Sequence, residues 1–240
     1  MKTVSARQLL ITFVPSLSIL VAILVVSILF QVSMPAMTQD VTAIAKLHPL
    51  SGILSNLGML LWCAAASTCF YTATILRGVK PRDTFGFLLS SGLLSAYLLF
   101  DDFFQIHEAL APHYLGLNEK VVYAALGIAV SAYLIAFRRI ILRTNFGILL
   151  SALGFLASSV VIDAIPGPWL WRIGDWEYFF EDGAKWLCIA SWCSYYVHTS
   201  HQFLVSSLGL PNNAIQPDDC TLRHGFPTLK RGIHGRSEVA

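Results

Sequence analysis

The chain alternates long apolar runs with short polar segments. Six runs are long enough to cross the hydrocarbon core of a bilayer as a helix, which takes about 20 residues. They cover residues 9–30, 53–76, 84–109, 121–137, 145–165 and 177–198. The first run exceeds the 7–15 apolar residues of a cleaved signal peptide, so we expect it to be retained as a span. The pattern predicts an all-α, polytopic integral-membrane bundle of six transmembrane helices over residues 1–199.

The basic residues predict the orientation of this bundle. Lys and Arg number 2 before the first run, 3 after the second, 3 after the fourth and 4 after the sixth, so 12 of the 16 lie on one side. Cytoplasmic loops carry the excess of Lys and Arg, which predicts that both termini are cytoplasmic. Residues 200–240 are rich in polar residues and proline and predict a flexible cytoplasmic tail. We expect a multi-pass protein of the bacterial plasma (inner) membrane.

Composition agrees with this assignment. Of the 240 residues, 55% are hydrophobic and 12% are charged, about half the charged share of an ordinary soluble domain. This excludes a basic nucleic-acid-binding domain and a disordered chain. The five cysteines include no C-x-x-C pair and are expected to be buried small hydrophobic residues. The expected partners are membrane lipids and a lipophilic substrate, with no nucleic acid.

The candidate chemistry lies in acidic residues that fall inside or beside the apolar runs. Ten of the 14 Asp and Glu residues belong to the half of the molecule opposite the basic loops. From the helical rise, Asp101 and Asp163 each lie about 25 Å from the basic end of their run, in a core of about 30 Å. Glu181 and Asp182 lie at a similar level in the last run. Carboxylates at this depth cost a few kcal/mol each and are usually functional, although a polar cap at the interface is the plain alternative.

These residues predict a metal site. Like charges gathered in a low dielectric must be protonated or bind a cation. A set rich in carboxylates with one histidine suits iron, manganese, magnesium or calcium better than structural zinc. The predicted ligands are Asp101, Asp102, His107, Glu108, Asp163, Glu181 and Asp182.

Helical spacing predicts how these side chains are arranged. On a straight helix Asp101, Gln105 and Glu108 share one stripe, whereas His107 points away from Glu108. No cation is evident in the sequence for Asp101.

A lysine in the last run predicts a counter-charge for the acidic groups. Lys185 follows Glu181 by four residues and Asp182 by three, so its ammonium can reach either carboxylate along the same helix. We expect Lys185 to balance the site and not to act as a base.

Three functions fit this pattern. The first is a metal-dependent integral-membrane enzyme acting on a lipid-soluble substrate. The second is a proton- or cation-coupled transporter, in which membrane carboxylates form a relay. The third is a non-catalytic membrane component whose polar cap binds a partner or lipid. The first is our leading hypothesis. No metal-binding motif with fixed spacing supports it, and the reaction and any catalytic residues stay open.

Overall fold

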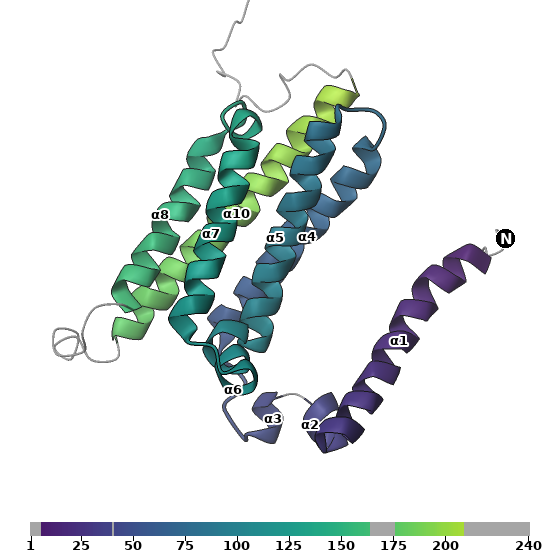
Figure 1. The fold of residues 1–240 in the computed structure, drawn as a ribbon, viewed down its shortest axis with the longest axis vertical. Helices are drawn as coiled ribbons and strands as arrows, with labels where there is room; N and C mark the ends of the chain where they lie inside the picture. The colour runs from purple at the N-terminus through teal and green to yellow at the C-terminus, as the bar shows by residue number, and fades with distance from the viewer. Residues whose placement is uncertain (1–5, 40, 164–175, 209–240) are drawn as a thin grey trace, which may run out of the picture.

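The computed structural model describes residues 6–39, 41–163 and 176–208, and in this part of the chain every regular element is a helix (Figure 1). This confirms the all-α class for these residues. The helices, in chain order, are α1 (Ala6–Phe30), α2 (Met34–Thr38), α3 (Val41–Ile44), α4 (Ile53–Leu76), α5 (Arg82–Phe104), the π-helical η1 (Ile106–Leu110), α6 (Ala111–Leu115), α7 (Glu119–Ile141), α8 (Phe146–Asp163) and α10 (Trp176–Ser207).

Within the described residues, four helices contain a segment long and apolar enough to cross a membrane. These segments are Phe13–Phe30, Ile53–Leu76, Arg82–Phe104 and Lys120–Ile141. The fifth predicted span forms a shorter apolar helix, and the sixth lies within the 32-residue α10, which carries more polar residues. The molecule is thus an integral membrane protein by the length and composition of its helices. The count of six spans and the side of each terminus stay predictions.

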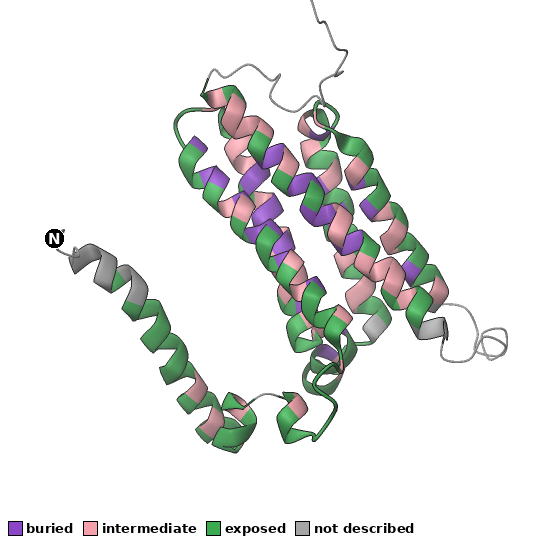
Figure 2. Cartoon of the chain, turned by 180° about the vertical axis from the view of Figure 1, so that it is seen from behind, coloured by how far each residue is buried: buried purple, intermediate pink, exposed green. Residues whose placement is uncertain are grey.

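Five long helices form the bundle, and α10 lies across its middle. It packs against α8 on one side and α4 on the other, and α4 in turn packs along α5. Buried aromatic side chains fill the contact region, among them Trp62, Phe87, Trp192 and Tyr196, and Figure 2 shows the buried positions on the inward faces of these helices. Aromatic burial of this kind dominates the energetics of a core.

The first helix stands apart from the bundle in Figure 1, connected to it through the short helices α2 and α3. Its apolar side chains are largely exposed; Leu24 and Leu29, for example, are 48% and 71% accessible. An apolar helix with no packed face is stable where lipid surrounds it. The exposure of α1 therefore agrees with a membrane setting.

A glycine sets the close approach of α4 and α5. A Cβ atom at Gly92 would lie 2.7 Å from two ring carbons of Phe70 on α4. Small residues at helix contacts let membrane helices approach closely. The neighbouring Ser91 and Ser95 are fully buried in the same helix.

The predicted third span is wrong at its acidic end. The sequence indicated one continuous helix to residue 109, but α5 ends at Phe104 and Gln105 adopts a left-handed conformation with φ 49° and ψ 48°. The Gln105 N–H closes the helix on the Asp101 carbonyl, and the chain continues as the π-helical turn η1. This break changes the direction of every side chain after Phe104, so the predicted stripe of Asp101, Gln105 and Glu108 does not form.

Candidate functional site

An acidic pocket lies at the end of the bundle where α5 stops and α10 begins. It is a cavity of about 120 Å³ to which α4, α5, η1, α7, α8 and α10 all contribute. We define it by its ionisable lining residues, which are Asp101, Asp102, His107, Glu108, Glu181, Asp182 and Lys185. The structure therefore brings together six of the seven predicted ligands and the predicted counter-charge. The seventh, Asp163, ends α8, and its side chain lies outside the described residues.

The centre of the pocket is a buried pair of Asp101 and His107. Asp101 Oδ2 lies 2.6 Å from His107 Nδ1, and Asp101 Oδ1 accepts the backbone N–H of His107 at 3.2 Å. Both residues are buried, with 3% and 6% of their surface exposed. The reversal at Gln105 makes this geometry possible, because it turns η1 so that His107 faces back onto α5. The sequence had suggested that Asp101 lacks a cationic partner, and this expectation is wrong.

Glu108 completes a chain of three ionisable groups. Its Oε1 lies 3.2 Å from His107 Nε2. The prediction that adjacent His107 and Glu108 diverge is therefore wrong, because it assumed a straight α-helix where the structure has a π-helical turn. Each ring nitrogen of His107 faces a carboxylate oxygen, and a carboxylate only accepts hydrogen bonds. The arrangement therefore favours the imidazolium form, in which both ring nitrogens carry a proton.

The environment of His107 changes its acidity. This residue lies beyond the apolar segment Arg82–Phe104. The hydrogen bond that His107 donates to Asp101 raises the pKa of His107 above its ordinary value of 6.5. The negative charges of Asp101 and Glu108 act in the same direction, whereas burial and the charge of Lys185 act against it. A histidine whose pKa lies above 6.5 carries its proton over more of the physiological pH range.

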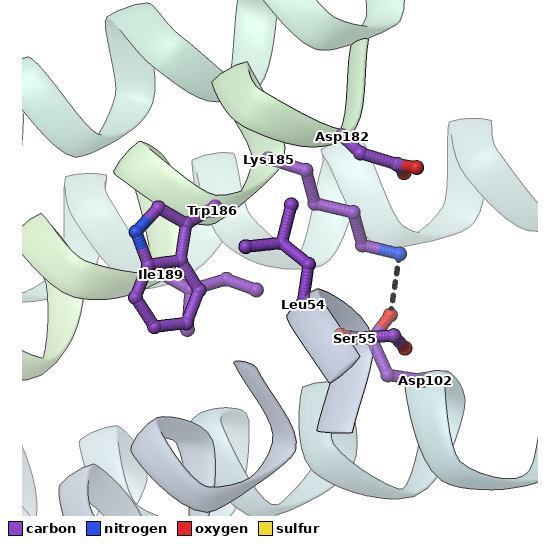
Figure 3. A pocket seen from close by; sticks show the side chains of 7 residues that line it. All are labelled: Leu54, Ser55, Asp102, Asp182, Lys185, Trp186 and Ile189. Atoms are coloured by element: carbon purple, nitrogen blue, oxygen red, sulfur yellow. Dashed lines mark ion pairs between the residues drawn. The ribbon is translucent and has the colours of Figure 1, made fainter. Parts of the chain in front are cut away.

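A second ion pair closes the other side of the pocket. Lys185 Nζ on α10 lies 2.8 Å from Asp102 Oδ1 on α5 (Figure 3). The indole N–H of Trp62 on α4 donates to Asp102 Oδ2 at 2.9 Å. Helical spacing had pointed to Glu181 and Asp182 as the carboxylates that Lys185 reaches. Lys185 pairs instead with Asp102 on another helix, so Asp102 also has a cationic partner.

Asp182 lies at the mouth of the acidic pocket. It is exposed and also lines a smaller cavity of about 40 Å³ beside Lys185 (Figure 3). Among the described residues it forms no ion pair within 4 Å, because Lys185 is directed to Asp102. The lining of the pocket thus contains five carboxyl groups and two basic groups, Lys185 and His107.

The predicted metal site does not appear in the described part of the chain. No group of three or more His, Cys, Asp or Glu side chains there is arranged to hold a metal ion. Three of the carboxyl groups have other partners there: Asp101 and Glu108 lie beside His107, and Asp102 lies beside Lys185 and Trp62.

Two aromatic residues of the pocket were missed by the sequence analysis. Trp62 donates to Asp102, and the ring of Tyr123 on α7 lies 4.7 Å from the ring of His107. Both fall inside apolar runs, where an aromatic residue usually serves packing. For Trp62 the sequence offered one signal: its indole N–H needs a hydrogen-bond acceptor when the side chain is buried.

Below the pocket the core carries buried hydroxyl groups. The indole N–H of Trp192 donates to Ser95 at 3.0 Å, and the Tyr133 hydroxyl lies within 2.8 Å of both Ser91 and Tyr196. These groups join α5, α7 and α10 through polar contacts in an otherwise apolar core.

Comparison with known proteins gives a family without an assigned activity. A family model described as Domain of unknown function (DUF8692) matches residues 17–199, which include α4, α5, α7 and α8 and most of α10. Searches of curated proteins and of solved structures find no match.

Proposed function

Because this chain belongs to the DUF8692 family, whose description states no activity, we propose a function from the acidic pocket: the protein is an integral-membrane enzyme that performs acid–base chemistry on a lipid-soluble substrate. The observation that carries this proposal is the Asp101–His107–Glu108 chain opening onto a cavity. A histidine whose Nδ1 is bound by a buried carboxylate is the arrangement that orients a general acid or base.

Each residue of the chain has a distinct part in this chemistry. Asp101 fixes the ring and stabilises its positive charge through Nδ1. His107 gives the proton on Nε2 to a substrate atom in the pocket and becomes neutral. Glu108, whose side chain is 48% exposed, swings aside to admit the substrate and afterwards returns a proton, taken up from bulk solvent, to Nε2. General acid–base catalysis of this kind contributes about 10²–10⁴-fold to a rate.

Lys185 and Trp62 support the pocket without exchanging protons. Both donate to Asp102 and so hold this second carboxyl group in place. A charged lysine cannot accept a proton, in agreement with the expectation that it balances the site.

The test is lipid conversion by purified protein. Wild type and His107→Ala are reconstituted in vesicles of total lipid extract, and all lipid species are compared by mass spectrometry over time. We expect wild type to convert one lipid class and His107→Ala to slow this conversion by about 10²-fold or more. His113→Ala, which removes an exposed histidine on α6, is the matched control and should convert normally. No conversion by wild type, or equal conversion by His107→Ala, would contradict the proposal.

One observation favours a second function, a proton-coupled transporter. The buried hydroxyl groups of Ser95, Ser91, Tyr133 and Tyr196 extend from the region of the pocket toward the opposite end of the bundle. Membrane proton relays use polar groups of this kind. A pH-sensitive dye inside the same vesicles separates the two functions: an imposed pH gradient dissipates through a transporter and persists with an enzyme.

A further inference from the structure

The surface of α10 beside the acidic pocket carries an apolar groove. The groove has a volume of about 480 Å³ and lies between α4 and α8, with Leu54, Phe155 and Trp186 among its lining residues. On α10 it extends from Phe179 to Leu187, which corresponds to about 12 Å of helix. Its length and apolar walls suit a hydrocarbon chain.

The groove adjoins the small cavity beside Lys185, and this cavity adjoins the acidic pocket that contains His107. Leu54 and Trp186 line both the groove and the small cavity beside Lys185, and Asp102, Asp182 and Lys185 line both the small cavity and the acidic pocket. Figure 3 shows the transition: Leu54, Trp186 and Ile189 gather on one side, and Lys185, Asp102 and Asp182 on the other. A molecule with an apolar tail and a polar head could therefore place its tail in the groove and its head in the small cavity.

The charges of the small cavity select the head group. The ammonium of Lys185 is engaged by Asp102 at 2.8 Å, so its charge is already balanced. The carboxylate of Asp182 faces the same cavity and forms no ion pair with another described residue. The adjoining pocket is lined by more carboxyl groups than basic groups. A cationic head gains a partner here, whereas a phosphate or carboxylate head meets repulsion.

We infer that the groove and the small cavity bind an amphiphile from the surrounding bilayer that has a hydrocarbon tail and an amine head. The tail lies along Phe179, Gly183 and Trp186, and the amine pairs with Asp182. The head group then stands at the entrance to the acidic pocket, within the series of cavities that leads to His107. As a statement about the enzyme's substrate class, this inference rests on the proposed function. Binding of the amphiphile does not itself require turnover.

The test uses three probes with the same hydrocarbon chain and a photoreactive diazirine in that chain. One ends in a primary amine, one in a hydroxyl and one in a phosphate. Each is crosslinked to the full-length protein in an uncharged maltoside detergent, and labelled peptides are identified by mass spectrometry. We expect saturable labelling of α10 and of the Leu54 region by the amine probe, at least 10-fold stronger than by the other two.

Two variants check the tail and head positions separately. Gly183→Phe fills the groove without a clash, since a Cβ atom at Gly183 meets nothing within 4 Å, and should lower labelling at least 10-fold. Gly147→Phe, at an equally open glycine near the start of α8, is the matched control and should label normally. Asp182→Asn should remove the preference for the amine while leaving the apolar contact intact.

The outcomes separate this inference from the proposed function. Equal labelling by all three probes would mean that the groove binds hydrocarbon chains without regard to the head group. Stronger labelling by the phosphate probe would mean that the site prefers an anionic head. Either result overturns the inference. Unchanged labelling of Gly183→Phe would place the binding elsewhere. His107→Ala should bind the amine probe normally, so if this variant also converts lipid as fast as wild type, the proposed chemistry fails while the binding site stands.

Discussion

Lys185 is paired with a carboxylate from a different helix, and this makes it a link between α10 and α5. Without its ammonium, Asp102 would keep only the Trp62 N–H as a partner. Lys185→Met should therefore lower the free energy of unfolding by about 2 kcal/mol. This is less than the 3–5 kcal/mol for breaking a fully buried pair, because the lysine side chain is 38% exposed. Thermal unfolding in detergent measures the effect.

A double variant identifies the cause of that loss. Asp102→Asn removes the stranded charge and keeps an oxygen that can accept from Trp62. Lys185→Met combined with Asp102→Asn should therefore be more stable than Lys185→Met alone. Additive losses in the double variant would show that the two side chains are not coupled. Lys185→Arg retains the charge and should be tolerated better than Lys185→Met.

The residues of the site were predictable, but their partners were not. Ionisable side chains within apolar runs are unusual enough to single out Asp101, Asp102 and Glu108 from sequence. Their pairing depends on the left-handed backbone at Gln105 and on which helices pack next to α5. A glutamine gives no sign of a positive φ, and helical spacing describes contacts within one helix only, so it could not indicate that Lys185 reaches α5.

At the scale of the element, the end of α5 determines the geometry of the site. Gln105 has a left-handed conformation, which costs an ordinary residue about 1–2 kcal/mol and costs glycine little. Allowing for the greater backbone entropy of glycine, Gln105→Gly should stabilise the protein by about 0.5–1 kcal/mol. Gln105→Val should destabilise it by about 1–2 kcal/mol, because a β-branched residue is a true outlier there.

The readout that links this turn to the site is the conversion assay. Gln105→Gly retains the reversal and should keep the activity of wild type. Gln105→Val favours an extended or straight path, moves His107 away from Asp101 and should lose activity along with stability. Equal unfolding temperatures for both variants and wild type would show that the left-handed turn is not required.

The contact of α4 with α5 gives a second prediction at this scale. Gly92→Leu places a side chain where Phe70 already lies, and overpacking of this kind costs about 1–3 kcal/mol. Gly127→Leu on α7 is the matched control, because a Cβ atom there meets nothing within 4 Å and leucine favours a helix over glycine. Unfolding in detergent should rank Gly92→Leu below wild type and Gly127→Leu at or above it. The reverse order would mean that the helices do not approach closely at Gly92.

At the scale of the whole molecule, the class of fold was clear from sequence and the topology was less so. Long apolar runs separated by charged turns require helices in a bilayer, because every backbone polar group has to be satisfied within its own segment. The helix of residues 53–76 was predicted to the residue. The 18 residues of α8 span only about 27 Å, and the 32 residues of α10 about 48 Å, so length and hydropathy alone do not establish the last two spans.

Reporter fusions test the orientation. With six spans and both termini in the cytoplasm, fusions after residues 80, 141 and 205 should report the cytoplasm, and fusions near residues 45, 115 and 170 the outside. The basis is the asymmetry of Lys and Arg along the chain. If fusions after residue 141 and near residue 170 report the same side, the fifth predicted span does not cross the membrane. If fusions near residue 170 and after residue 205 report the same side, the sixth does not. An inverted pattern would place the acidic pocket on the cytoplasmic side.

The measurement that tests the central claim most directly is the titration of His107 by nuclear magnetic resonance. The full chain is labelled with ¹⁵N-histidine in detergent, and His107 is assigned as the signal missing from His107→Gln. The hydrogen bond and charge of Asp101 favour the protonated ring, so both nitrogens should stay protonated as the pH rises through 6.5 and lose a proton only above it. Asp101→Asn removes this effect and should lower the pKa of His107. A His107 that titrates at or below 6.5, unchanged by Asp101→Asn, would contradict a proton-exchanging role for this pair.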